Sequence, residues 1–184
     1  MKIKTARFGD LDVNADEVVT FPDGILGFSE HRRYCLVDPG DDTLILWMQS
    51  IDNASIAFPI LEPRIFKSDY VVKLSAQDLA QLKLENIKQS IVFNILTIPR
   101  DVTQMTANLK APIVINLREQ IGKQVVLQES EYTLKHPMFC ELKIHLATIA
   151  AANAAQRAAN EARAAASLPI NLRSMMPSAQ IKTL

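Results

Sequence analysis

Alternating apolar and polar positions organise the first two-thirds of the chain into short segments. Residues 2–8 alternate, and Val18–Phe21 is a β-branched run with an aromatic end. Arg33–Val37 follows, and then the runs Leu44–Ser50 and Ser55–Leu61 form a pair. Gly-, Pro- and Asp-rich stretches, which favour turns, separate most of these runs. The pattern therefore predicts a series of short β-strands.

One helix interrupts this series. Ser75 is typical of an N-cap, and Asp78 stands three residues later, at the second position of a capping box. Leu79 and Leu82 then repeat at helical spacing. The next segment, Ser90–Ile98, is almost continuously apolar, which is typical of a strand covered on both faces or forming a barrel wall.

The stretch Thr106–Asn116 combines a polar entry, a proline and three branched apolar residues. It predicts a short buried strand with Ile113–Ile115 in the core. Pro112 has no N–H to donate, so we expect it at the start or edge of the strand. Lys123–Leu127 predicts a further strand, with Gly122 at the turn before it.

The spacing of the apolar residues changes at Pro137 from the short spacing of strands to that of a helix. The pattern predicts a helix that packs one apolar stripe on the body, formed by Met138, Phe139, Leu142, Leu146 and Ile149. From Ala147 to Ala166, twelve of twenty residues are alanine, which favours a helix but offers few large side chains to bury. We expect a β domain at 1–140, an Ala-rich helix at 141–166 and a disordered tail at 167–184.

About nine short strands with one helix between them indicate a mainly β fold, either a sandwich or a small barrel with helical additions. A doubly wound α/β fold would need a helix between most successive strands, and the sequence predicts only one such helix. The two cysteines, Cys35 and Cys140, lie far apart, and no stretch resembles a signal peptide or a membrane span. We therefore expect a cytoplasmic protein with reduced thiols.

The formal charge is balanced, with 20 basic and 20 acidic residues, but it is unevenly distributed. Residues 1–140 carry 15 basic and 18 acidic side chains, a net charge of −3. Nonspecific nucleic-acid binding depends on clustered Lys and Arg. The composition of the body therefore argues against direct binding to nucleic acid.

No combination of residues suggests catalysis, a metal or a cofactor. His136 and Cys140 would share one face of a helix, but His145 would lie on the opposite face. His31 has no activated nucleophile beside it. The segment Gly24–Gly27 lacks the Lys-Ser/Thr of a phosphate-binding loop. Its loop instead presents Ile25, Leu26 and Phe28, which either fold under the body or form an apolar patch.

Three stretches taken together resemble the FliW family of bacterial flagellar assembly factors. They are Phe21–Phe28 (Phe-Pro-Asp-Gly-Ile-Leu-Gly-Phe), Thr106–Asn116, and Lys123–Leu127 followed by Tyr132–Pro137. The resemblance covers residues 1–140. It implies a small closed or nearly closed antiparallel β-barrel without enzymatic activity. It also implies a protein that binds flagellin and the translational regulator CsrA, and so relieves CsrA repression of flagellin translation.

If the resemblance holds, we expect the partners to contact exposed loop residues. Apolar loop side chains are natural anchors for a partner helix, and acidic side chains can attract an RNA-binding regulator. We expect neither cofactor nor membrane binding, and a monomer when the protein is free. The expected partner-binding residues are Ile25, Leu26, Phe28, Asp41, Asp42 and Asn108.

The alternative hypothesis is a small-molecule-binding or enzymatic β-barrel with its ligand in the mouth of the barrel. Only the architecture favours it, and a fold alone does not establish a function.

Overall fold

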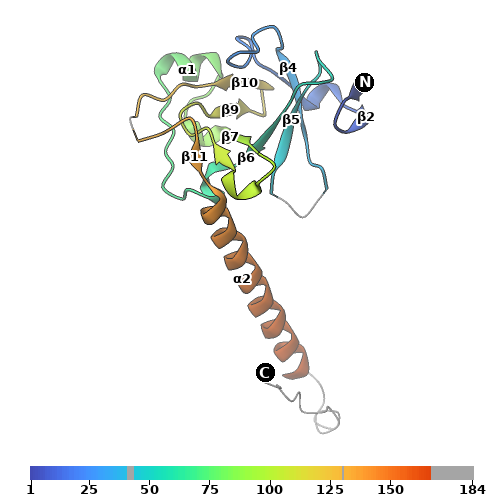
Figure 1. Cartoon of the computed structure of the whole chain (residues 1–184), viewed down its shortest axis with the longest axis vertical. Coiled ribbons are helices and arrows are strands. Elements are labelled where there is room, and N and C mark those ends of the chain that lie inside the picture. Colours follow the sequence, from blue (N-terminus) through green and yellow to red (C-terminus); the bar gives the residue numbers. More distant parts are fainter. Residues whose placement is uncertain (41–43, 130, 167–184) are drawn as a thin grey trace. The chain divides into compact units, whose positions relative to one another are not determined.

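The computed structural model describes residues 1–40, 44–129 and 131–166 (Figure 1). Short strands dominate the described part up to Pro137, as the apolar pattern predicted. The strands are β1 (Lys2–Thr5), β2 (Gly9–Asp12), β3 (Val18–Thr20), β4 (Arg33–Val37), β5 (Leu46–Ser50), β6 (Ala57–Leu61), β7 (Ile91–Thr97), β8 (Thr106–Ala107), β9 (Ile113–Asn116), β10 (Ile121–Gln124) and β11 (His136–Pro137). The helices are α1 (Ala76–Gln81), α2 (Phe139–Ala166) and the 3-10 turns Ala15–Glu17, Pro63–Ile65, Ile87–Gln89 and Val102–Gln104.

Seven of these strands close into a barrel. Their order is β7-β6-β5-β4-β3-β10-β9, and a ladder between β7 and β9, with Ile91 opposite Ile115 and Phe93 opposite Ile113, completes the ring. The ladders are antiparallel except that β10 meets β3 in parallel at Ile121 and Thr20. β8 and β11 add to the sheet beyond β7, and β1 pairs with β2 as a separate hairpin. The predicted closed β-barrel is confirmed, with one parallel junction.

Alternate residues of the strands fill the barrel interior. Because successive side chains of a strand point to opposite faces, one residue in two turns inward. Tyr34, Met48 and Ile60 are fully buried in this inner core, and Phe21 packs edge-to-face on Tyr34 with ring centroids 5.3 Å apart. Ile113 and Ile115 of β9 join them, as the sequence predicted.

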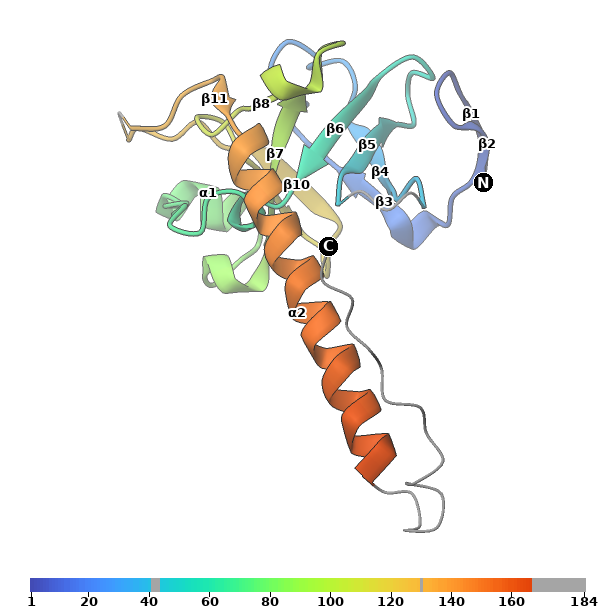
Figure 2. The same cartoon turned by 60° about the horizontal axis from the view of Figure 1, so that its bottom comes forward.

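A second core lies on the outer face of β7 and β9. Val114 points outward between its two inward neighbours and is fully buried. Side chains from the segment around α1 and from the C-terminal part of the body cover it, among them Tyr70, Leu82 and Met138. The chain therefore has one core inside the barrel and one against its wall, and the two share β7 and β9. Figure 2 shows α1 and the β1–β2 hairpin on opposite sides of the barrel.

The N-terminus of α1 has the predicted capping box. The Ser75 side chain accepts a hydrogen bond from the Asp78 amide at 3.1 Å, and the Asp78 carboxylate accepts one from the Ser75 amide at 3.0 Å. The box satisfies two amides that the first turn leaves without a helical partner.

The stretch Thr106–Asn116 forms two strands rather than one. β8 and β9 are separated at residues 108–112, where Asn108 turns the chain. Pro112 directly precedes β9, in agreement with the prediction, and its carbonyl accepts a hydrogen bond from the Val125 amide at 2.9 Å.

The prediction that Gly122 marks a turn is wrong, because this residue lies inside β10 and pairs with Ile115. The turn comes earlier and includes Gln120, whose φ is 54°. A Cβ atom at Gly122 would lie 2.3 Å from the Phe21 ring, so the glycine leaves room for that ring. β10 consequently begins before the predicted strand Lys123–Leu127 and ends within it.

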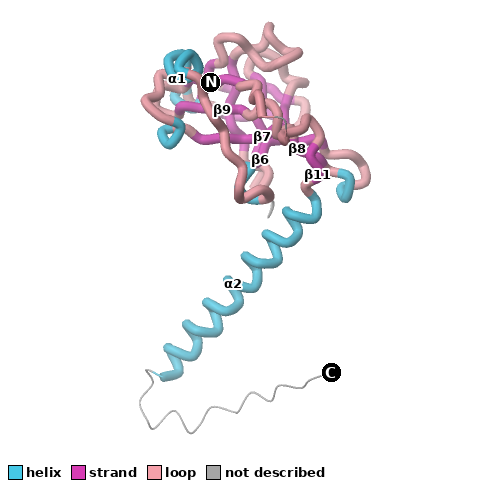
Figure 3. The backbone as a smooth tube through the Cα atoms, turned by 90° about the vertical axis from the view of Figure 1, so that its left-hand side faces the viewer, coloured by secondary structure: helices cyan, strands magenta, loops and turns pink. Residues whose placement is uncertain are grey.

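The compact body runs from Met1 to Leu142, and residues from Lys143 onward form a second unit. α2 begins in the body, where Met138 and Leu142 are buried in the outer core. In the second unit Leu146 and Ile149 have exposed fractions of 42% and 38%, and twelve of the 24 residues from 143 to 166 are alanine. Figure 3 shows α2 as one continuous helix. The predicted tail at 167–184 lies outside the described residues. None of the described helices is both long and apolar enough to cross a membrane.

Candidate partner-binding surface

The loop from Phe21 to Phe28 is a tight double turn. The Gly24 amide donates to the Phe21 carbonyl at 2.9 Å, and the Phe28 amide donates to the Ile25 carbonyl at 2.7 Å. Gly24 has a φ of +68°, and a Cβ atom there would lie 2.6 Å from the Cα of Ser29. Only glycine fits this conformation and this contact, so the Pro-Asp-Gly sequence determines the path of the loop.

The three apolar loop residues have different environments. Leu26 exposes 62% of its surface, and Phe28 exposes 38% while its ring packs edge-to-face on Phe58, with centroids 5.0 Å apart. Ile25 has an exposed fraction of 2% and belongs to the inner core. The loop therefore does both things that the sequence left open: Ile25 folds under the barrel, while Leu26 and Phe28 form an apolar surface. Burial makes Ile25 unsuitable as a contact residue.

Gln124 of β10 connects this loop to the stretch before β9. Its Oε1 accepts a hydrogen bond from the Leu26 amide at 2.9 Å, and its Nε2 donates to the Ala111 carbonyl at 3.1 Å. A shallow hollow of about 160 Å³ lies between the loop and β10. The three sequence stretches thus meet at one amide side chain. Sequence reasoning assigned no role to Gln124, because a polar residue in a half-exposed strand gives no signal of its own.

Asn108 shapes the turn between β8 and β9. Its Oδ1 accepts from the Ala111 amide at 3.0 Å, its amide donates to the Ile95 carbonyl at 2.9 Å, and its carbonyl accepts from Asn94 Nδ2 at 2.6 Å. The half-buried side chain thus positions Ala111, to which Gln124 binds. The structure gives Asn108 a positioning role behind the loop surface. The predicted residues Asp41 and Asp42 lie outside the described residues.

The ionisable groups near this surface form structural contacts. Lys123 binds Asp78 at 2.5 Å and contacts Gln81, which ties β10 to α1. Desolvation of the Asp78 carboxyl opposes ionisation, but the hydrogen bonds from Lys123 and Ser75 together outweigh it and lower its pKa.

In the inner core, burial raises the pKa of Tyr34 to about 12, so this phenol stays protonated at neutral pH. The described residues include no group of three or more His, Cys, Asp or Glu side chains that could hold a metal ion.

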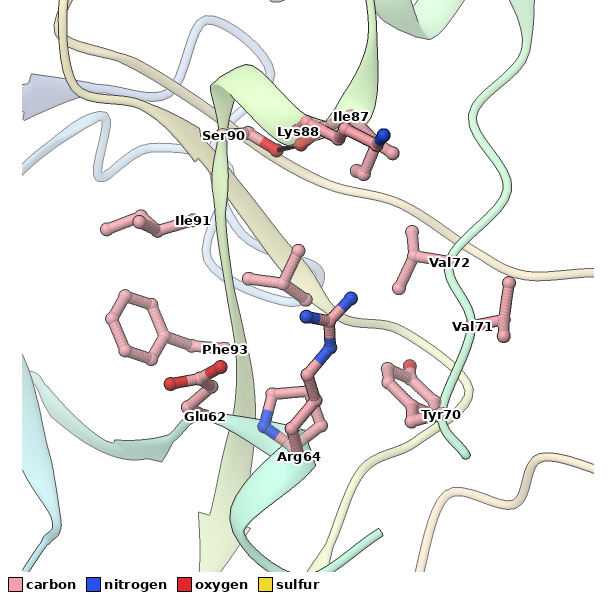
Figure 4. Close-up of a pocket in the computed structure, with 12 residues that line it drawn as sticks. Glu62, Arg64, Tyr70, Val71, Val72, Ile87, Lys88, Ser90, Ile91 and Phe93 are labelled. Atoms are coloured by element: carbon pink, nitrogen blue, oxygen red, sulfur yellow. Dashed lines mark hydrogen bonds between the residues drawn. The ribbon is translucent and has the colours of Figure 1, made fainter. Parts of the chain in front are cut away.

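A separate hollow of about 410 Å³ lies at the edge of β7, and residues of both cores line it, among them Phe93 of the inner core and Tyr70 of the outer core. β7 forms one wall, the segment Tyr70–Val72 forms the opposite wall, and the turn Pro63–Ile65 closes one end. Figure 4 shows the side chain of Arg64 extending into the space between the two walls. The sequence-based alternative places a ligand in the barrel mouth, whereas this hollow lies beside the wall.

Fold and surface together define a small closed β-barrel with an exposed apolar loop, which a hydrogen bond to Gln124 of β10 anchors. Comparison with known proteins gives the family. The family model described as "FliW protein" matches residues 2–138. The chain is 40% identical over 144 residues to the flagellar assembly factor FliW of Thermoanaerobacter pseudethanolicus, covering 78% of this chain and 96% of that protein.

Two further comparisons agree. The chain is 41% identical over 143 residues to the flagellar assembly factor FliW of Bdellovibrio bacteriovorus, covering 78% of this chain and 82% of that protein. A crystal structure of the flagellar assembly factor FliW superposes with a TM-score of 0.71 at 33% identity, covering 76% of this chain and 97% of that one. The chain therefore belongs to the FliW family, as the three sequence stretches predicted.

Proposed function

We propose that this protein is a cytoplasmic flagellar assembly factor that binds flagellin and the translational regulator CsrA. The observation that carries the proposal is the family match over residues 2–138, which spans the whole barrel. In the proposed cycle, flagellin occupies the factor until flagellin is secreted. The released factor then binds CsrA and prevents it from repressing translation of flagellin mRNA.

The apolar loop surface, defined here as Leu26 and Phe28, is the contact we propose for a partner helix. Large apolar side chains near the centre of an interface contribute most of its binding free energy. Leu26 is exposed, and its backbone is held by Gln124, so the loop loses little conformational freedom on binding. The exposure of the Leu26 side chain and the fixed backbone of the loop therefore support this contact.

The charge of the body supports the proposed interaction with CsrA. Residues 1–140 have a net charge of −3, and a regulator that binds RNA carries basic surface. An acidic partner attracts such a surface and repels RNA from it. We propose that Asp41 and Asp42 contribute to this attraction, so that replacing both with Lys weakens CsrA binding.

A binding assay with purified components tests the proposal. The full chain is immobilised and offered flagellin or CsrA separately, and CsrA-repressed translation of a flagellin mRNA is followed in vitro with and without the chain. We expect capture of both proteins and restored translation. Capture of neither protein would reject the proposed function.

Leu26→Asp tests the loop surface, and Val102→Asp is the matched control. Both side chains are exposed apolar residues, at 62% and 48%, so neither substitution introduces a charge into a core. We expect Leu26→Asp to weaken capture of at least one partner by about tenfold or more, since a hot-spot residue contributes about 2 kcal/mol. Equal capture by both variants and the parent chain would exclude the loop surface as the contact.

A further inference from the structure

The wall of the barrel has an opening where β6 leaves β7. The β6–β7 ladder consists of two pairs, Ile60 with Ile95 and Leu61 with Asn94. Continued by two residues, the register would place Pro63 opposite Val92. Pro63 starts a 3-10 turn and has no N–H, so it cannot extend the ladder. On this side, the first residues of β7 face the hollow of about 410 Å³.

The other contacts of β7 show to which side each of its main-chain N–H and C=O groups points. The Ile95 carbonyl accepts the Asn108 amide, so the polar groups of Ile95 point toward β8 and β9. Because these groups alternate along a strand, Ile91 and Phe93 also point toward β9, where their ladder partners lie. Val92 points the other way, toward the opening. Within the described residues, its N–H and C=O have no backbone partner on that side.

The hollow has the composition of a peptide-binding groove. Val72, Ile91 and Phe93 give it apolar walls on either side of the free strand edge. Arg64 and Lys88 line it as exposed cations, and neither forms an ion pair within the described residues. Glu62 is the one carboxylate among the residues that line the hollow, so their formal net charge is +1. Arg64 reaches into the space between the walls in Figure 4. The free strand edge can pair with the main chain of an extended peptide, the apolar walls can receive its apolar side chains, and the central Arg64 can bind an acidic one.

We propose that this opening binds an extended peptide segment of a partner protein, which adds a strand to β7. One peptide residue pairs its N–H and C=O with those of Val92. That residue is acidic, its carboxylate lies against Arg64, and its apolar neighbours enter the hollow. This site is separate from the apolar loop surface and goes beyond the proposed binding of flagellin and CsrA. A result that rejects binding of those two proteins therefore does not reject the peptide site.

A defined peptide tests the site. The probe is the acetylated and amidated pentapeptide Thr-Val-Glu-Val-Thr, added at millimolar concentration to the ¹⁵N-labelled full chain. We expect the Val92 amide resonance to shift and its hydrogen exchange to slow by about tenfold, because the amide gains a hydrogen-bond partner. A peptide methylated on the glutamate nitrogen cannot donate to the Val92 carbonyl and is expected to bind more weakly.

Charge reversal tests the role of Arg64. We expect Arg64→Glu to weaken binding of the glutamate peptide by about tenfold and to favour a peptide with lysine in its place. Arg100→Glu is the matched control, since Arg100 is exposed and does not line the hollow, and it should bind like the parent chain.

Several results would overturn the proposal. These are an unchanged Val92 amide, a shifted Val92 resonance without slower exchange, or equal binding of the glutamate and lysine peptides. Equal effects from butyrate alone would indicate a small-carboxylate site instead. Slower exchange of Val92 that depends on protein concentration without peptide would indicate a second copy of the chain.

Discussion

At the scale of single residues, Gly122 is where the barrel leaves no room for a side chain. Its added Cβ would lie 2.3 Å from Cζ of Phe21, and the Phe21 ring is fully buried against Tyr34. We predict that Gly122→Ala lowers the free energy of unfolding by about 1–3 kcal/mol, the usual cost of overpacking a core. Urea denaturation of the parent chain and the variant measures this difference in the free energy of unfolding.

A double-mutant cycle identifies the cause. Phe21→Leu removes the ring atoms that the new methyl group would meet, so the combined variant should lose less stability than the two single variants added together. Additive losses would mean that the cost arises elsewhere. An unchanged midpoint for Gly122→Ala would mean that the Phe21 ring is not held in place as the packing indicates.

The residue-level prediction from sequence succeeded where the signal was local. Ile113–Ile115 are buried because three branched residues in a row have no polar face. It failed for Gly122, where the deciding neighbour, Phe21, is far away in sequence. Likewise the spacing of Ile25, Leu26 and Phe28 could not indicate which of them folds inward, since that depends on the closed barrel beneath the loop.

At the scale of elements, Asp78 joins α1 to β10. It caps the helix through Ser75 and binds Lys123 at 2.5 Å. Desolvation raises its pKa, but these hydrogen bonds together lower it below the ordinary value of 3.8. A carboxyl whose pKa is lower in the folded chain stabilises that chain at pH values above 3.8, and the contribution disappears as the pH falls through the lowered pKa.

We therefore predict that Asp78→Asn flattens the acid side of the stability profile. Between about pH 5 and about pH 2, the parent chain should lose more stability than the variant, because the variant has no carboxylate to protonate. Urea denaturation at each pH gives the comparison. Asp10→Asn, at an exposed position of β2, is the control and should follow the parent chain. An identical slope for Asp78→Asn and the parent would refute the proposed link.

Features of the helices and strands were predictable from the sequence where neighbouring residues determine them, and were missed where distant residues do. The capping box at Ser75 was predictable because both of its partners lie within four residues of sequence. The parallel contact of β10 with β3 was not, because it depends on how the ring closes. Asn108 splits the predicted strand Thr106–Asn116 through bonds to Asn94 and Ile95, and no local pattern indicates those bonds.

At the scale of the whole molecule, the family match and the compact body end close together. The match ends at residue 138 and the body at Leu142, whereas α2 continues to Ala166. The resemblance could therefore predict the barrel, but it provides no counterpart for the Ala-rich helix. The helix side chains described beyond Leu142 are mostly exposed, so they contribute little buried area.

This division predicts the outcome of two truncations. A chain lacking residues 150–184 retains Met138 and Leu142 in the outer core, so its thermal midpoint should match that of the full chain. A chain ending at Pro137 loses both side chains and should be less stable by at least about 2–5 kcal/mol, the cost of emptying one such core position. If the barrel carries the binding surface, the first truncation should capture flagellin and CsrA within about twofold of the full chain. Loss of either partner from that folded truncation would instead assign the contact to the Ala-rich helix or the residues that follow it.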